Sequence, residues 1–269
     1  MSEPRGWTAR HPELGTGTVP VSPYVSREWF ERERERVFRR AWLNVCREED
    51  LPACGDYLVK NLAGCGASIL LVRGRDEGLR AFHNVCSHRG SRIARGSGNA
   101  PSRFVCRFHG WTYDVEGRLE SVPDEAQFAE FDKSTGGLAP VGLETWQGFV
   151  FVNLDPSPAG SLSEYLGEIG ERLAGYPFAS MVRLGEYAAE VAANWKYVLD
   201  IFQECYHVPT VHNRTVADAG TGEANPLSHL VWAHCDRLHR SASVYMNPAH
   251  QPTAAEALAF RYGASIVQA

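Results

Sequence analysis

Several features that mark other protein classes are missing from these 269 residues. No apolar run approaches the roughly 20 residues that a membrane-spanning helix needs, and the start of the chain is polar rather than signal-like. There is no basic excess, because 32 acidic and 27 basic residues give a net charge of −5. No internal repeat or low-complexity tract is visible. The sequence therefore predicts a cytoplasmic protein that binds neither a membrane nor nucleic acid.

Cysteine is too sparse for a disulfide scaffold, since the seven cysteines are an odd number spread over a long chain. In a reducing compartment such cysteines are buried thiols or metal ligands. We expect Cys46, Cys54, Cys65 and Cys235 to be small buried hydrophobic residues. Two of the others, Cys86 and Cys106, stand close to histidines, which directs the search for a site toward metal chemistry.

The texture of the chain divides it into three parts, and its 44% hydrophobic content allows a substantial core. Residues 1–45 form a proline-rich arm and then a helix with Ser26 as its N-cap. Residues 46–157 carry short β-rich runs separated by glycines, at 57–60, 68–73, 79–84 and 149–153, which predicts a small all-β domain. Residues 158–269 begin with a helical stripe over 162–173, continue with a helix over 193–207 before Pro209, and include a β-rich stretch over 230–245. The fold class is α+β.

Two motifs in the β-rich part pair one cysteine with one histidine. They are Cys86-Ser-His88-Arg-Gly90 and Cys106-Arg-Phe-His109-Gly110-Trp111. A Cys2His2 zinc site, the alternative, normally groups its two cysteines together and its two histidines together. Two thiolates on one iron and two imidazoles on the other define a Rieske [2Fe–2S] centre, which the alternating order favours.

These motifs, with the phrase at residues 146–156, resemble the cluster domain of Rieske non-haem iron oxygenases. The resemblance implies that Cys86, His88, Cys106 and His109 hold a [2Fe–2S] cluster. It also implies a small all-β Rieske domain inserted near the N-terminus of a helix-plus-antiparallel-sheet (helix-grip) catalytic domain.

A second group of ionisable residues lies in the third part of the chain. Asp200, Glu204, His207 and His212 fall within thirteen residues of an apolar stretch. On a helix Glu204 and His207 share a face, whereas His212 points about 140° away unless the break at Pro209 re-aims it. Two histidines and one carboxylate form the facial triad of non-haem iron oxygenases.

By the same resemblance, His207 and His212 are ligands of a mononuclear Fe²⁺, and Asp200 matches another acidic position of the family. Glu204 matches the residue that bridges this iron to a cluster histidine of the neighbouring subunit, here His109. The third, carboxylate ligand belongs on a later helix, so we expect a C-terminally truncated catalytic domain. The remaining acidic candidates lie in no recognisable motif: Asp218, Glu223, Asp236 and Glu256.

The resemblance implies the alpha subunit of a multicomponent oxygenase that takes electrons from a reductase or ferredoxin and uses O₂ to hydroxylate an aromatic or other small organic substrate. It also implies a homotrimer, with or without a small beta subunit. The phrase Glu204-Cys-Tyr-His207 is similar to that of quaternary-amine oxygenases, which need aromatic residues around a cation. Three aromatic residues, Trp195, Tyr197 and Tyr206, are available, with core packing as the alternative. Other open alternatives are a stand-alone electron carrier, a zinc protein, and a truncated cluster protein without turnover.

Overall fold

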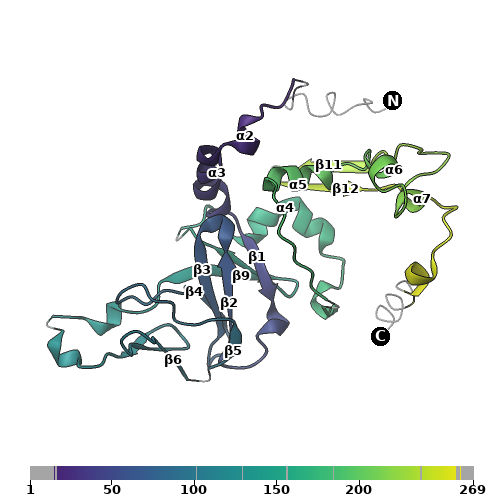
Figure 1. Cartoon of the computed structure of the whole chain (residues 1–269). Coiled ribbons are helices and arrows are strands. Elements are labelled where there is room, and N and C mark those ends of the chain that lie inside the picture. The colour runs from purple at the N-terminus through teal and green to yellow at the C-terminus, as the bar shows by residue number, and fades with distance from the viewer. Residues whose placement is uncertain are drawn as a thin grey trace. The chain divides into compact units, whose positions relative to one another are not determined.

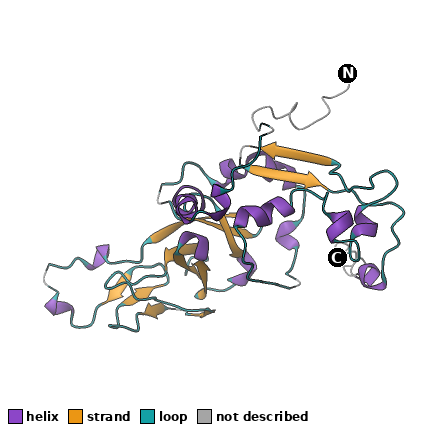
Figure 2. Ribbon diagram, turned by 45° about the horizontal axis from the view of Figure 1, so that its top comes forward, coloured by secondary structure: helices purple, strands orange, loops and turns teal. Residues whose placement is uncertain are grey.

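The computed structural model describes residues 15, 17–100, 102–128, 130–155, 157–183, 185–236, 238–258 and 261. The chain forms two compact units (Figure 1): residues 1–167 with 174–186, and residues 168–173 with 187–269. The first unit contains most of the strands, whereas the second has short helices, long loops and one hairpin (Figure 2). Among the described residues no helix has the length and apolarity to cross a bilayer.

Two short helices, α2 (Ser22–Val25) and α3 (Arg27–Glu33), precede the first strand. The Ser26 hydroxyl accepts the N–H of Trp29 at 3.1 Å, which confirms the predicted N-cap. The chain then continues through a π-helical turn, Arg34–Phe38. Arg34 donates from this turn to the carbonyl of Gly64 at 3.2 Å, which fastens the helix to the β-rich core.

A seven-stranded antiparallel sheet in the order β1-β10-β9-β4-β3-β2-β5 dominates the first unit. Its strands are β1 (Leu43–Arg47), β2 (Asp56–Leu62), β3 (Ala67–Arg73), β4 (Leu79–His83), β5 (Ser97–Asn99), β9 (Pro140–Trp146) and β10 (Phe149–Asn153). The four strands predicted from the sequence are confirmed as β2, β3, β4 and β10. Strands β9 and β10 are joined by Gln147 and Gly148, both at positive φ (51° and 78°), as a two-residue hairpin requires.

The sequence of strand β3 is a continuous apolar run rather than an alternating one, because both faces of the strand are buried. Leu70 and Val72 face one hydrophobic cluster, and Ile69 and Leu71 face another; all four are fully buried. Because successive side chains point to opposite faces, a strand covered on both sides has no polar face. The strand therefore separates the two cores of this unit.

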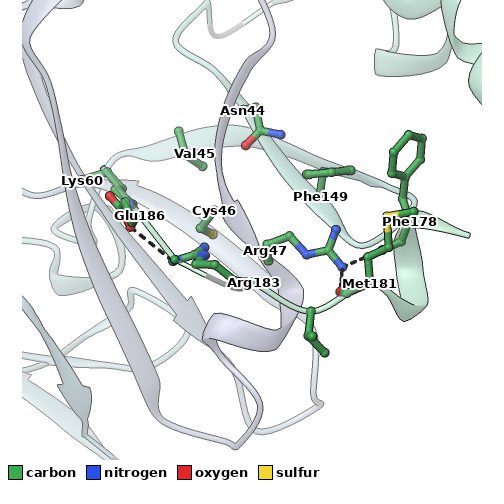
Figure 3. A pocket seen from close by; sticks show the side chains of 12 residues that line it. Asn44, Val45, Cys46, Arg47, Lys60, Phe149, Phe178, Met181, Arg183 and Glu186 are labelled. Carbon is green, nitrogen blue, oxygen red and sulfur yellow. Dashed lines mark hydrogen bonds and ion pairs between the residues drawn. The ribbon is translucent and has the colours of Figure 1, made fainter. Parts of the chain in front are cut away.

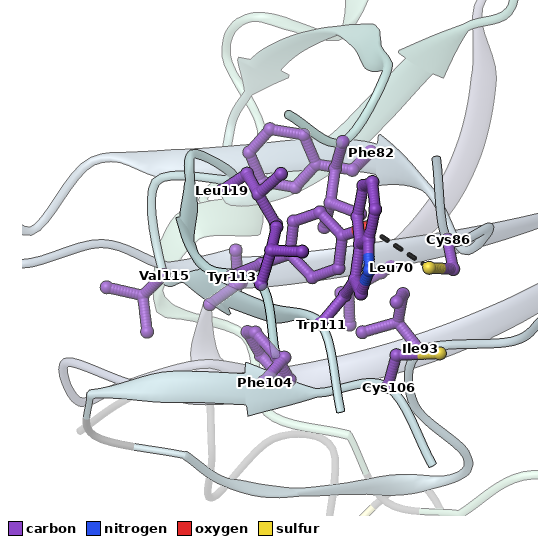
Figure 4. Packing of buried hydrophobic residues seen from close by; sticks show 13 residues of the cluster. Leu70, Phe82, Cys86, Ile93, Phe104, Cys106, Trp111, Tyr113, Val115 and Leu119 are labelled. Atoms are coloured by element: carbon purple, nitrogen blue, oxygen red, sulfur yellow. Dashed lines mark hydrogen bonds between the residues drawn. The ribbon is translucent and has the colours of Figure 1, made fainter. Parts of the chain in front are cut away.

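A smaller three-stranded sheet carries the second cysteine motif. It consists of β6 (Arg103–Val105), β7 (Thr112–Asp114) and β8 (Leu119–Ser121). Its core joins Phe104, Tyr113 and Leu119 to Leu70 and Phe82 of the larger sheet (Figure 4). Two loops, one after β4 and one between β6 and β7, are thus held against one hydrophobic cluster.

Helix α4 (Leu162–Leu173) confirms the predicted helical stripe, with a break at Gly167 (φ 49°, ψ −138°) at the boundary between the units. The second unit then contains α5 (Trp195–Ile201), α6 (Val208–Val211), α7 (Ala217–Gly220) and the hairpin β11 (Trp232–Asp236) and β12 (His239–Ser243). The hairpin confirms the β-rich prediction. The helix predicted over 193–207 is wrong in extent, because α5 stops at Ile201.

Candidate metal centres

Two loops of the first unit have nearly the same backbone construction. In each loop the cysteine N–H donates to a carbonyl at the far end of the loop, at 2.7 Å for Cys86 and 2.8 Å for Cys106. A glycine four residues later donates back to the cysteine carbonyl at 2.9 Å, from Gly90 in one loop and Gly110 in the other. Both glycines have positive φ, 73° and 75°, which other residues adopt only with strain. The repeated geometry places the two cysteines in equivalent positions.

The two cysteines point inward and the two histidines point toward solvent. Cys86 and Cys106 are each 2% exposed within the core that Figure 4 draws, whereas His109 is exposed and His88 half-buried. The two imidazole rings lie 4.7 Å apart between centroids. Buried sulfurs and surface imidazoles, one of each from each loop, provide the donor set of a two-iron centre with a sulfur-ligated inner iron and a histidine-ligated outer iron.

Hydrogen-bond donors surround the sulfur atoms. Burial alone would raise the pKa of the Cys106 thiol, but hydrogen bonds from the N–H groups of Phe108 and His109 and from Cys86 lower it. The Tyr113 hydroxyl lies 3.1 Å from Cys86 Sγ, and burial, together with that contact, raises the pKa of Tyr113 to about 12. The phenol therefore stays protonated and can donate to a thiolate. These donors fit a negatively charged sulfur cluster.

Two residues that the sequence analysis did not single out position these loops. Asn84 is fully buried, and its carbonyl oxygen accepts the N–H groups of Ile93 and Ala94, each at 3.0 Å. Its amide donates to the carbonyl of Ala94 at 3.0 Å and to Ser68 Oγ at 3.2 Å. Asn84 thereby ties the first loop to β3. The signal in the sequence is only an asparagine two positions before a candidate ligand, and its burial is seen in the structure alone.

In the second unit, His207 and His212 flank the one-turn helix α6 as its N-cap and C-cap residues, and their side chains approach each other. Their ring centroids are 5.3 Å apart. Residues 202–207 form turns, and α6 begins at Val208 with Pro209 in its first turn, so the proline starts a helix rather than ending one. The break predicted at this proline is therefore a turn followed by a new helix, and this change of direction brings His212 toward His207.

Glu204 is bonded to His207 through both carboxylate oxygens. One oxygen lies 2.5 Å from His207 Nδ1, and the other accepts the His207 N–H at 3.1 Å. Partial burial would raise the pKa of Glu204, but these hydrogen bonds lower it below its usual value. With Nδ1 held by the carboxylate, Nε2 of His207 is the nitrogen left for a metal. Asp200 lies on the exposed surface of α5.

No group of three or more His, Cys, Asp or Glu side chains in the described ranges is placed to hold a metal ion. For the second unit it means that His207 and His212 form a pair that neither Asp218 nor Glu223 joins. Glu256 contacts His250 instead, at 3.4 Å.

Histidines and cysteines outside these motifs have other surroundings. His234 Nε2 lies 3.0 Å from Glu168, and the His229 ring stacks 6.2 Å from Tyr206. Cys46 and Cys65 are buried as predicted. The prediction for Cys54 is wrong, because this residue is exposed beside the turn at Gly55, and Cys235 is only partly buried.

A pocket of about 430 Å³ lies in the first unit between β1, β2 and the segment 178–186 (Figure 3). Arg47 donates to the carbonyls of Phe178 and Met181 at 2.8 and 3.0 Å, and Arg183 pairs with Asp50 at 2.8 Å. Its lining includes none of the predicted iron ligands. These bonds hold the segment against the sheet, so the pocket belongs to the framework of this unit.

Comparison with known proteins finds a family match in each half of the chain. Residues 41–134 match the model of the Rieske [2Fe-2S] domain, and residues 178–267 match that of the ring hydroxylating alpha subunit (catalytic domain). The carnitine monooxygenase oxygenase subunit of Escherichia coli K12 is 37% identical over 197 residues, which cover 72% of this chain and 52% of that protein.

Solved structures give the same result. The quaternary ammonium Rieske monooxygenase CntA in complex with gamma-butyrobetaine has a TM-score of 0.68 and 34% identity, covering 73% of this chain and 56% of that one. Naphthalene 1,2-dioxygenase from Rhodococcus sp. has a TM-score of 0.71 and 29% identity, covering 87% and 55%.

Fold and matches together define an iron–sulfur protein with a Rieske domain and part of an oxygenase catalytic domain. The chain belongs to the family of Rieske oxygenase alpha subunits, whose cofactors are a [2Fe–2S] cluster and a mononuclear iron. Members of this family include both monooxygenases and dioxygenases, which are oxidoreductases. The chain spans about half the length of the curated relatives it matches.

Proposed function

We propose that this chain acts in the oxygenase component of a multicomponent Rieske system, with Cys86, Cys106, His88 and His109 as the cluster ligands. The carrying observation is the pair of equivalent loops, which bury two sulfurs and hold an exposed and a half-buried imidazole with their ring centroids 4.7 Å apart. In the same proposal His207 and His212 hold the mononuclear iron. Bound there, the two centres supply one-electron transfer and oxygen activation.

The protein groups have separate roles in this scheme. Tyr113 and the N–H groups of the second loop stabilise negative charge on the sulfurs. Glu204 fixes the tautomer of His207 by holding its Nδ1. We propose that Glu204 also couples this histidine to His109 of a neighbouring copy in a trimer, and that a reductase or ferredoxin is the electron donor.

We propose a quaternary ammonium compound as the substrate, with an aromatic compound as the second candidate. The supporting observation is the 37% identity with a carnitine monooxygenase oxygenase subunit, combined with the phrase Glu204-Cys-Tyr-His207. The aromatic residues named above do not enclose a free cation site: Lys196 covers the Trp195 ring at 5.1 Å, and Tyr197 and Tyr206 are 58% and 64% exposed. The substrate proposal therefore rests on the resemblance and not on an aromatic cage.

Metal and sulfide analysis of the purified protein tests the assignment. We expect about two acid-labile sulfides and about three irons per chain. A zinc protein without sulfide would contradict the proposal, and about two irons with full sulfide would favour a cluster-only electron carrier. With a reductase supplied, turnover of carnitine or glycine betaine against an aromatic acid decides the substrate class.

Glu204→Ala separates electron transfer from metal binding. We expect both metal centres to remain filled while oxygen consumption coupled to substrate falls about a hundredfold, since the proposed bridge between His207 and His109 of a neighbouring copy is lost. The control is Glu223→Ala, which removes an exposed carboxylate from the same unit. Retention of coupled turnover in Glu204→Ala would show that the bridging role is wrong.

A further inference from the structure

The pocket between β1, β2 and the segment 178–186 lies at an irregular edge of the large sheet, and we call it the β1 pocket. Strand β1 stands at one end of the strand order and pairs with β10. The register of this pair shifts between Asn44 and Cys46, which makes Val45 the extra residue of a β-bulge. A regular strand directs only every second side chain to one side. At the bulge, residues 44–47 all line the pocket, so the irregular backbone gathers four successive residues around one cavity.

One wall of the β1 pocket is apolar and aromatic (Figure 3). The rings of Phe149 and Phe178 lie with their centroids 5.7 Å apart, and the guanidinium of Arg47 lies 4.6 Å over the Phe149 ring. Met181 and Val182 also line the pocket and are 36% and 61% exposed, so a ligand that covers them removes apolar surface from water. A cavity of about 430 Å³ is in the size range of small-molecule sites. The wall therefore suits a flat, apolar ring system.

One cation of the β1 pocket has no anion of its own. Lys60 on β2 is half-buried, and its ammonium makes no hydrogen bond or ion pair to any other residue that the structure describes. Arg47, in contrast, donates to two backbone carbonyls. Arg183 is paired with Asp50 at 2.8 Å and with Glu186 at 3.4 Å. Both guanidinium groups are thus already engaged, whereas the charge of Lys60 is left for a ligand.

The thiol of Cys46, which also lines the pocket, does not supply the missing negative charge. Burial, together with the charge of Asp50, raises the pKa of Cys46 to about 11 although the charge of Lys60 lowers it, so the thiol is neutral near physiological pH. Asn44 adds an exposed side-chain amide that makes no hydrogen bond within the described residues. An ammonium and an amide N–H are both donors, and a carboxylate accepts from each of them. The polar side of the pocket therefore suits one carboxylate.

We propose that the β1 pocket binds a small aromatic carboxylate, whose anion is held by Lys60 and Asn44 while its ring packs against Phe149 and Phe178. The site is separate from the proposed reaction, because its lining includes none of the predicted iron ligands. A quaternary ammonium compound fits it poorly, since its cation would lose water beside the unpaired charge of Lys60. The ligand is therefore additional to the proposed substrate, and its binding requires neither the cluster nor the mononuclear iron.

Calorimetric titration of the purified, cluster-loaded chain tests the proposal. The probe is 2-naphthoate, and its uncharged counterpart 2-naphthamide has the same rings and nearly the same volume. We expect naphthoate to bind with a Kd of about 0.1–1 mM, as the binding energy per atom of small ligands allows. The amide should bind at least about tenfold more weakly, because it carries no charge to pair with Lys60.

Two substitutions in the pocket should shift the Kd for naphthoate in opposite directions. Lys60→Gln removes the cation and should raise the Kd about tenfold. Glu186→Gln removes a carboxylate that repels the anion and should lower the Kd about threefold. The matched control is Lys133→Gln, since Lys133 is a half-buried lysine of the same unit that pairs with Glu125 at 3.0 Å and does not line the pocket. This control should leave the Kd unchanged.

Three outcomes would overturn the inference. An unchanged Kd in Lys60→Gln, or equal binding of the amide, shows that the charge of Lys60 holds no ligand. An equal loss in Lys133→Gln reduces the effect to net charge. A Kd that does not fall in Glu186→Gln contradicts the site even where Lys60→Gln fails to fold, because the Glu186 side chain is 69% exposed and its replacement leaves the core intact. A chain without labile sulfide contradicts the proposed function alone, whereas a cluster-loaded chain that binds no naphthoate contradicts the pocket alone.

Discussion

Replacing Tyr113 with phenylalanine removes one hydroxyl from the core beneath the candidate cluster. Tyr113 is fully buried, and its oxygen lies 3.1 Å from Cys86 Sγ, 2.9 Å from Ser87 Oγ and 3.2 Å from the Ser87 N–H that it accepts. Phenylalanine fills the same space, so the packing of the ring is retained. The substitution therefore isolates the hydrogen bond to sulfur from the volume of the side chain.

The size of the effect follows from the charge on the sulfur. A hydrogen bond to a charged acceptor contributes about 1.5–3 kcal/mol. Since reduction adds negative charge, the bond stabilises the reduced cluster more than the oxidised one, by an estimated ~1 kcal/mol or about 40 mV for one electron. We expect Tyr113→Phe to lower the cluster potential by about this amount. The free energy of unfolding should fall by about 1 kcal/mol, because the Ser87 N–H loses its acceptor.

A redox titration followed by circular dichroism or electron paramagnetic resonance measures the change. Tyr57→Phe is the matched control, because Tyr57 packs on Phe104 in the same core at 5.4 Å and its hydroxyl makes no hydrogen bond to another described residue. Its cluster potential should match that of the unmodified chain. If Tyr113→Phe retains the cluster but shifts the potential by less than about 10 mV, the hydroxyl does not act on the sulfur.

Three further substitutions or modifications test the framework. Asn84→Ala leaves the N–H groups of the first loop without an acceptor and should cost about 3 kcal/mol in urea unfolding; a loss below about 1 kcal/mol would contradict the tethering role. Gly117→Ala places a Cβ in steric overlap with the ring of Phe82, at φ +83°, and should lower the free energy of unfolding by about 2–4 kcal/mol. An unchanged Tm would show that the ring moves freely. Burial raises the pKa of Cys46 to about 11, so its thiol stays protonated at pH 8 and should resist a thiol reagent that labels exposed Cys54, as mass spectrometry of the labelled protein can check.

The β-rich unit is largely predictable because its signals are local. The β-rich runs at 68–73 and 149–153 each predict a strand, and the structure has β3 and β10 there. The pairing order of the seven strands was not predictable, because each strand satisfies its hydrogen bonds equally well beside several partners. Only the packing of two separate cores, divided by β3, selects the observed order.

The candidate ligands were predictable for a different reason. Metal chemistry restricts residue type and spacing, so Cys86 and His88 are recognisable without knowledge of the backbone. Residues that act through other residues carry no such restriction. Tyr113 lies 27 positions from Cys86 and reaches it only because β7 packs beside the first loop. The spacing of residues along the sequence cannot predict a contact that depends on tertiary packing.

The Glu204–His207 contact was predicted for the wrong structural reason. Helical spacing brings residues three apart together, but α5 has ended at Ile201 before either residue. Continuing the helix would require an N–H that Pro209 lacks, so the chain turns and begins α6 with the proline in its first turn. In that turn Glu204 accepts the backbone N–H of His207 as well as contacting its ring. One carboxylate thus fixes both the backbone and the imidazole of a candidate ligand, which a regular helix could not do, because there the same N–H would bond to a carbonyl.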